Sequence, residues 1–190
     1  MKQIIIIFIF AIFFSSCACL EKSVDNSGIF LTKSNLTLLN GKYQRKSVQI
    51  GKDSLSVGDL YWNLFANSYS FALATDVEVL NLKSDVDFIE LKVINKNKIL
   101  VSYINENDTL ASKIMKGKIK NGYFEFRRKY LIIPLIFSNV YKNSKFRIGL
   151  SNDNNLMGDY KNITLGTIIV LYPIYDNVSE NDIKYNRIVN

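Results

Sequence analysis

From residue 77 to residue 172 the chain alternates short apolar segments with clusters of turn residues. The turn clusters lie at residues 84–85, 95–98, 105–108 and 121–122, and the last of them is Asn121-Gly122. Asn and Gly tolerate the positive φ angles of the type I′ turn that joins the strands of a tight β-hairpin. Successive hairpins place each strand beside the next one along the chain. The pattern therefore predicts an all-β fold built as an antiparallel meander.

We expect about eight to ten strands, which form an antiparallel barrel or a sandwich. Closure into a barrel is favoured, because a consecutive meander removes its two edges in that way. A short helix near residues 57–66 is also expected, because an S-x-x-D start at Ser56 precedes apolar residues at i, i+1, i+4 and i+5 spacing. Pro134 cannot donate to the ladder of a central strand, so we expect a corner or bulge there. The expected strands are 42–50, 77–83, 86–94, 99–104, 109–120, 123–130, 145–150, 156–160 and 167–172.

Residues 1–16 have the anatomy of a bacterial export signal, in which Lys2 precedes an apolar run at 4–14 and small residues follow. The apolar run is too short to span a bilayer comfortably as a helix. Phe14-Ser15-Ser16-Cys17 resembles a relaxed lipobox, so we expect Cys17 to carry the acyl chains that hold the mature protein at a membrane. Cys19 is the alternative modified residue. An ordinary cleavable signal and an uncleaved single-span anchor are the competing interpretations.

The remaining chain has the size of one ordinary domain. Residues 17–38 are polar and irregular, which predicts a flexible tether between the membrane and the fold. Residues 39–175 would form the β-barrel domain. The polar tail, residues 176–190, is expected to be a short helix or to stay loose.

The amino-acid composition excludes several kinds of chemistry from the folded part. Both cysteines, Cys17 and Cys19, lie at the signal junction, and the chain has no histidine. A disulfide framework, a thiolate or imidazole metal site and mechanisms that depend on histidine are therefore excluded. Asp85 and Asp87 would share one face of a strand, but carboxylates beside a turn are normally solvated. We therefore expect no enzyme activity, no catalytic residue, no cofactor and no metal.

Two groups of side chains are candidate binding residues. Five aromatic residues would line a small apolar cavity inside a barrel, or would fill its interior solidly. Five basic residues around the hairpin at 121–122 would form a patch, or would simply be solvated on outward positions. An exported protein does not meet nucleic acid, so we expect no nucleic-acid partner. The aromatic residues are Trp62, Phe65, Phe124, Phe126 and Phe146, and the basic residues are Lys116, Lys118, Lys120, Arg127 and Arg128.

Four short motifs punctuate the expected domain: Leu39-Asn40-Gly41-Lys42-Tyr43, Leu60-Tyr61-Trp62-Asn63-Leu64-Phe65, the hairpin at 116–124, and Arg147-Ile148-Gly149-Leu150 leading to Asn154-Asn155-Leu156. Together they resemble uncharacterised lipoproteins of Bacteroidota with a lipocalin-like barrel. The resemblance implies a lipocalin-like (calycin-like) fold over most of residues 39–172 and carries over no catalytic or ligand residue. Where lipocalins have Gly-x-Trp, this chain has Gly41-Lys42-Tyr43.

These observations predict a non-catalytic lipoprotein of the bacterial cell envelope, held at the outer membrane and facing the periplasm or the cell exterior. Its expected partner is a small apolar ligand or an envelope component. The net charge of +7 also favours contact with lipid phosphates. The alternative is a protein-interaction module, such as an immunity or envelope-assembly factor, that uses the basic strands 116–129.

Overall fold

The computed structural model describes residues 20, 28–48, 59–61, 63–64, 87–106, 108–126, 129–134, 138–168 and 172–189. Within these ranges the chain is almost entirely antiparallel β-sheet, with one short 3-10 helix and no α-helix among the named elements. The elements in chain order are β1 (Gly28–Ile29), the 3-10 helix η1 (Leu36–Leu39), β2 (Gly41–Gln44), β3 (Phe88–Asn95), β4 (Lys98–Asn105), β5 (Asp108–Lys120), β6 (Tyr123–Phe126), β7 (Lys129–Pro134), β8 (Ser138–Ser151), β9 (Leu156–Ile168), β10 (Tyr172–Tyr185) and β11 (Arg187–Ile188).

The strands follow one another through the sheet as a meander, which confirms the predicted all-β class. The order is β10-β9-β8-β6-β5-β4-β3-β2-β11, and both β1 and β7 pair with β8 beside this path. All of these pairings are antiparallel. The turn between β5 and β6 has positive φ at Asn121 (53°) and Gly122 (81°), as the Asn-Gly sequence predicts.

Strand β5 turns the corner between two parts of the sheet. Its first part pairs with β4 as far as Lys116, and its last part pairs with β6 from Gly117 onward. A Cβ atom at Gly117 would lie 2.5 Å from the Phe124 ring and 2.6 Å from the backbone oxygen of Glu125. Glycine is therefore needed at this corner because β6 crosses too close for any side chain.

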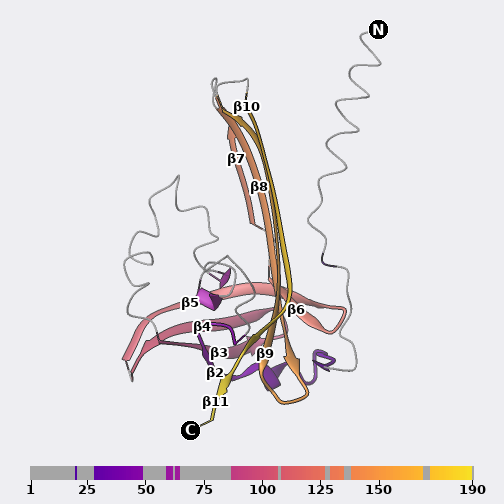
Figure 1. Cartoon of the computed structure of the whole chain (residues 1–190). Helices are drawn as coiled ribbons and strands as arrows, with labels where there is room; N and C mark the ends of the chain where they lie inside the picture. Colours follow the sequence, from indigo (N-terminus) through magenta and orange to yellow (C-terminus); the bar gives the residue numbers. More distant parts are fainter. Residues whose placement is uncertain are drawn as a thin grey trace.

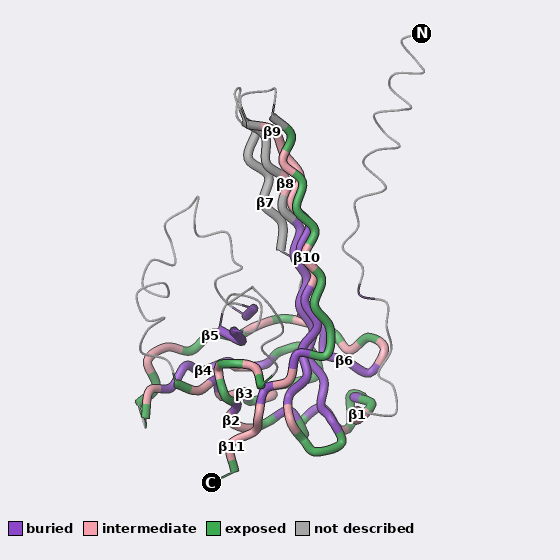
Figure 2. The backbone as a smooth tube through the Cα atoms, in the orientation of Figure 1, coloured by how far each residue is buried: buried purple, intermediate pink, exposed green. Residues whose placement is uncertain are grey.

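Strands β7 to β10 form a narrow ribbon that rises from the body of the molecule and crosses the layer of β2 to β5 (Figure 1). β7 pairs with the upper part of β8 and ends at Pro134, opposite Asn139. The sequence predicts an interruption at this proline. Among the ribbon positions whose burial Figure 2 shows, the buried ones lie in the lower part, where β8 and β9 enter the body.

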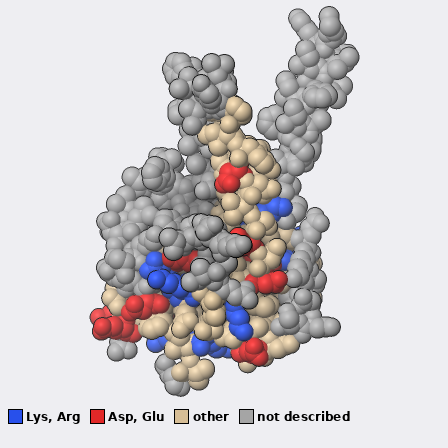
Figure 3. All heavy atoms as spheres, viewed as in Figure 1, with Lys and Arg blue, Asp and Glu red and all other residues tan. Residues whose placement is uncertain are grey.

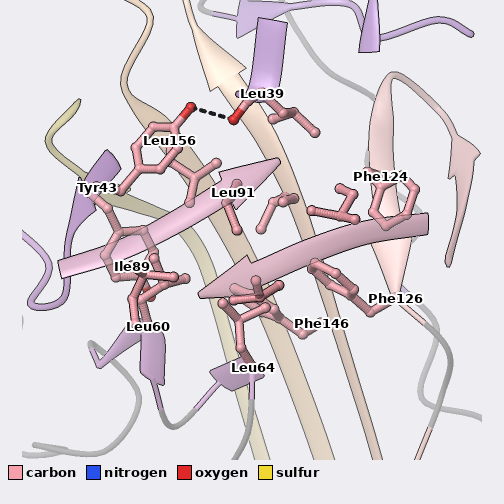
Figure 4. Close-up of a cluster of buried hydrophobic side chains, with 14 of the residues drawn as sticks. Leu39, Tyr43, Leu60, Leu64, Ile89, Leu91, Phe124, Phe126, Phe146 and Leu156 are labelled. Carbon is pink, nitrogen blue, oxygen red and sulfur yellow. Dashed lines mark hydrogen bonds between the residues drawn. The ribbon is translucent and has the colours of Figure 1, made fainter. Parts of the chain in front are cut away.

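The hydrophobic core lies in the body, between β2 to β5 on one side and β6, β8 and β9 on the other. Leucines from η1, aliphatic residues from β3 and β4, and aromatic residues from β6 and β8 meet there (Figure 4). The Tyr43 hydroxyl donates to the backbone oxygen of Leu39 at 3.0 Å, which ties β2 to η1 inside this core. Fully buried core residues include Leu31, Leu36, Leu39, Leu60, Ile89, Val101, Phe124, Ile148, Leu156 and Tyr185.

Two expectations about the chain ends are wrong for residues that the structure describes. The sequence predicts a flexible tether at 17–38, whereas Leu31 and Leu36 are buried in the core and the Leu31 amide donates to the Gly122 oxygen. The tail at 176–190 is neither helical nor loose, because it forms most of β10 and all of β11. Ile183 and Tyr185 alternate with polar residues near the end of β10, and both of these side chains are buried.

Other strand and helix predictions are confirmed only in part. β3 and β4 agree with the expected strands, whereas β2 ends at Gln44 and Lys46 forms an isolated bridge with Asp59. β8 and β9 extend well beyond the expected 145–150 and 156–160. Half of the predicted helix at 57–66 and the whole predicted strand at 77–83 lie outside the described residues.

The named pairings leave the sheet open between β10 and β11, so the predicted closure into a lipocalin-like barrel is not confirmed. These two end strands are nevertheless neighbours along the chain, separated only by Asn186. Over the stretches described above, no helix is long and apolar enough to cross a bilayer.

Candidate functional site

A row of charged side chains crosses the sheet on the face opposite to the core. Glu125 of β6 is the direct neighbour of Arg147 of β8, and Arg147 is the direct neighbour of Asp159 of β9. Neighbours in register point to the same face, whereas Phe124 and Ile148, one position along, belong to the core. The charged face is nevertheless buried, because Arg147 is 1% exposed and Asp159 is 0% exposed.

Arg147 and Asp159 form the central ion pair of this row. Arg147 Nε donates to Asp159 Oδ2 at 2.7 Å, and Nη2 lies 2.6 Å from the same oxygen. The other carboxylate oxygen, Oδ1, accepts the backbone N–H of Asp182 at 2.9 Å. Asp182 has φ of 57° and lies where the register of β10 shifts. Asp159 therefore holds both the guanidinium and the bulge of the last long strand.

The ring of Tyr123 covers the guanidinium of Arg147. The Arg147 Cζ atom lies 4.0 Å from the ring centroid, a close cation–π contact. The ring reaches this position because Gly149 has no side chain, since a Cβ there would lie 2.8 Å from the Tyr123 ring. The motif Arg147-Ile148-Gly149 therefore places a cation and the space for its aromatic cover on one face of β8.

Arg147 also binds the segment that follows the expected signal junction. Its Nη1 donates to the backbone oxygen of Leu20 at 3.3 Å, and Leu20 itself is buried. Leu20 is three residues beyond Cys17. Three residues of extended chain span at most about 10 Å.

A second buried ion pair lies beside the first. Lys145 Nζ is 2.9 Å from Glu125 Oε2, and both side chains are less than a tenth exposed. The two pairs bring two cations and two anions together, so the cluster is electrically balanced. Buried pairs of this kind are strongly destabilised when one partner is lost, because the other charge remains without compensation. We call Glu125, Lys145, Arg147 and Asp159 the buried charge cluster.

A further ion pair fixes the segment at 59–64 against the end of β2. The Arg45 guanidinium contacts both carboxylate oxygens of Asp59, with the shortest distance 2.8 Å from Nη2 to Oδ2. Asp59 Oδ1 also accepts the backbone N–H of Tyr61 at 2.9 Å. Leu60, Tyr61 and Leu64 are thereby held in the core.

Two buried tyrosines have perturbed acidity. Burial raises the pKa of Tyr43 to about 12, and the nearby Arg187 guanidinium opposes part of this rise. Burial also raises the pKa of Tyr185, whose hydroxyl accepts a hydrogen bond from Asn63 Nδ2 at 3.1 Å. Neither phenol is deprotonated near neutral pH, so both act as neutral hydrogen-bonding groups.

The structure brings three of the five predicted aromatic residues together. Phe124 and Phe126 meet edge to face with ring centroids 5.2 Å apart, and Phe126 stacks on Phe146 at 5.9 Å. All three rings are buried, and Figure 4 shows them on one side of the core. Trp62 and Phe65 lie outside the described residues.

The predicted basic residues on β5 are exposed and point to the same face. Lys116, Lys118 and Lys120 occupy alternate positions of the strand. Lys118 is the direct neighbour of Glu125, so it continues the row of the buried charge cluster by one strand. Figure 3 shows basic and acidic side chains interspersed over the described surface in that view. Arg127, Arg128 and Cys17 lie outside the described residues.

Sequence reasoning missed the buried charge cluster, although a signal for it is present. In 145–150 every second residue is apolar, and the residues between them are Lys145, Arg147 and Gly149. Such alternation is typical of a strand with one solvated face, but both charged residues are buried. Asp85 lies outside the described residues, and Asp87 Oδ2 accepts the backbone N–H of Glu106 at 3.2 Å, as a turn residue does.

The described part of the site consists of paired charges, buried hydrogen bonds and packed aromatic rings. Among the residues that the structure describes, no three His, Cys, Asp or Glu side chains are placed so that they could hold a metal ion. Comparison of this chain with protein-family models, curated proteins and solved structures gives no match.

Proposed function

We propose that this chain is a non-catalytic lipoprotein of the bacterial cell envelope, acylated at Cys17 and acting as a binding protein at the outer membrane. The observation that carries the proposal is the hydrogen bond from Arg147 to the Leu20 oxygen. Leu20 is buried although it lies directly beyond the apolar and small-residue run of the N-terminus. A chain whose fold begins three residues after Cys17 is well matched to cleavage and acylation at that residue.

The partner in this proposal is a small apolar ligand or an envelope component. The rings of Phe124, Phe126 and Phe146 pack against one another, so they fill the space that a ligand between them would need. This packing supports the envelope component as the partner. An interior site for an apolar ligand is the second candidate. It would be supported by a lipid or other apolar molecule that co-purifies with the protein and is released by organic solvent.

The proposal includes closure of the sheet into a lipocalin-like barrel. Two backbone hydrogen bonds of 2.9 Å support it, from Gln44 N to Asn186 O and from Val48 N to Lys184 O. They join the region around β2 to the end of β10, the two parts that must meet in a closed ring. Slow hydrogen exchange at the Gln44 and Val48 amides, comparable to that of core strands, is the expected result. Fast exchange at both amides would contradict closure.

The experiment for the anchor compares Cys17→Ser with the matched variant Cys19→Ser. The intact mass of protein extracted from membranes should correspond to a chain that begins at Cys17 and carries acyl chains. Cys17→Ser should lose both the acyl mass and the membrane fractionation, because the thiol is the attachment point. Cys19→Ser should keep both. Unchanged mass and fractionation of Cys17→Ser would overturn the proposal.

A further inference from the structure

Five exposed lysines share the outer face of β3, β4 and β5. Residues that alternate with the buried Ile89, Leu91, Ile99 and Val101 point outward, and the outward positions of β5 are their cross-strand neighbours. Only one acidic residue, Glu90, shares the outward positions of β3, β4 and the part of β5 from Ser112 to Lys120. We call this set the lysine face: Lys92, Lys98, Lys116, Lys118 and Lys120.

The arrangement of these lysines is unfavourable for the isolated protein. Lys98 and Lys116 are direct cross-strand neighbours, and like charges in such positions destabilise a sheet. An anion that binds between them removes this repulsion. The face therefore has the charge complementarity that an anionic partner requires.

Exposed apolar side chains lie among the lysines. Ile114 is 53% exposed and Ile94 is 48% exposed, and Ile114 is the direct neighbour of Leu100. Lysine ammonium groups next to isolated aliphatic side chains match a membrane surface, where the ammonium meets phosphate and the aliphatic group enters the headgroup region.

The docked N-terminal segment lies on the same side of the sheet. Lys118, Glu125 and Arg147 are in register across β5, β6 and β8, and Arg147 binds the Leu20 oxygen. Adjacent strands are about 4.8 Å apart, so Lys118 and Arg147 are separated by about 10 Å. Acyl chains on Cys17 would thus enter the membrane close to the lysine face.

From these observations we infer that the lysine face lies against the membrane and binds the phosphates of anionic phospholipids. The inference rests on the proposed acylation, and it assigns the membrane-facing side of the domain. The acyl chains hold the protein at the bilayer, and the lysines set its orientation.

The test uses the protein purified from cell membranes and reconstituted into vesicles of phosphatidylcholine alone or with about one third phosphatidylglycerol. Amine labelling of each lysine is read by peptide mass spectrometry. All five lysines of the lysine face, Lys92 and Lys98 included, should be labelled about fivefold less on the anionic vesicles, and high salt should restore labelling. Lys33 and Lys46, which are exposed outside this face, should not change.

Two matched triple variants distinguish binding by the lysine face from a general effect of positive charge. In the variant Lys116→Ala/Lys118→Ala/Lys120→Ala, Lys92 and Lys98 should lose their protection. In the variant Lys33→Ala/Lys46→Ala/Lys113→Ala, Lys92 and Lys98 should keep their protection, because all three substitutions lie outside the lysine face. Lys113 is the neighbour of core-facing Val101 and lies on the opposite face of β5. The intact mass of the same sample reports acylation, so a failed anchor is distinguished from a failed orientation.

Three results would overturn the inference. One is that Lys116, Lys118 and Lys120 are labelled equally on both kinds of vesicle although the mass of the protein shows that it is acylated. Another is that Lys33 and Lys46 lose as much labelling on the anionic vesicles as the lysine face does. The third is protection that persists without anionic lipid and requires a co-purifying protein, which would assign the face to a protein partner.

Discussion

The Nη1 atom of Arg147 lies 3.3 Å from the backbone oxygen of Leu20, its hydrogen-bond acceptor 127 positions earlier in the chain. The same guanidinium is covered by Tyr123 and paired with Asp159. One buried side chain therefore joins the N-terminal segment, the β5–β6 hairpin and β9.

Removal of Arg147 should be much more harmful than removal of the whole pair. Arg147→Met leaves the Asp159 carboxylate buried without its cation, so the free energy of unfolding should fall by about 3–5 kcal/mol. Arg147→Met/Asp159→Leu should recover most of this loss, because no buried charge is then left alone. Urea unfolding at neutral pH measures both values.

The exposed pair Lys184–Asp153 is the control for this prediction. Its N–O distance is 3.5 Å, and the Asp153 side chain is 75% exposed. Lys184→Ala should change the free energy of unfolding by less than about 1 kcal/mol. A loss in Arg147→Met as small as the loss in this control would mean that the buried pair does not hold the fold.

Gly117→Ala should destabilise the corner of β5. The new Cβ would lie 2.5 Å from the Phe124 ring and 2.6 Å from the Glu125 oxygen, so β6 must move away from β5. The expected loss is about 1–3 kcal/mol, read from the shift in thermal midpoint and from urea unfolding. Lys116→Ala, at the preceding exposed position, should stay within about 0.5 kcal/mol of the wild type. Equal midpoints for the two variants would contradict the close crossing.

The C-terminal residues should be essential for stability. Tyr185 is fully buried, and loss of its ring in Tyr185→Ala should cost about 3–5 kcal/mol, as for other large aromatic residues in a core. Val189 is 88% exposed, and Val189→Ala should leave stability within about 0.5 kcal/mol. If the two variants unfolded at the same urea concentration, the last strands would not be part of the core.

Tyr43 should make the protein sensitive to alkaline pH. Burial raises its pKa to about 12, compared with 10.0 in the unfolded chain, so the folded state holds this proton more tightly. Its contribution to stability is complete below pH 10 and is lost as the pH rises through 12. The slope for this group is about 1.4 kcal/mol per pH unit within that window.

Tyr43→Phe is the variant that tests this titration. At neutral pH it should be about 1 kcal/mol less stable, because the hydrogen bond to the Leu39 oxygen is lost. Between pH 10 and 12 its free energy of unfolding should fall less steeply than that of the wild type. Parallel curves over this window would show that Tyr43 does not titrate with a raised pKa.

Local patterns predicted the parts of the fold that depend on neighbouring residues. The Asn121-Gly122 hairpin and the pairing of β3 with β4 follow from turn chemistry and alternation over a few positions. The positions of the two chain ends in the fold do not follow from local patterns. Leu31 ends the short apolar run Ile29-Phe30-Leu31, and Tyr185 lies in a polar stretch, so only the packing of distant strands shows that both positions are interior.

The candidate site also combines residues that a local pattern predicts with residues whose positions depend on the tertiary structure. The exposed lysines of β5 were recognised as one face because alternate residues of any strand share a face. Arg147 and Asp159 looked equally polar, yet they are buried because register brings them together and Leu20 docks on them. Burial of a charge depends on compensation by a partner, and the partner here lies twelve positions away in the sequence.

By itself, the amino-acid sequence determined the β class, the meander order and the tight hairpin, because each depends on residues close together in the chain. The tertiary structure alone decided which polar residues are interior, where the N-terminal segment docks and how the C-terminal strand joins the core. These features depend on contacts between residues such as Leu20 and Arg147, and the free energy of such contacts exists only after the strands have come into register.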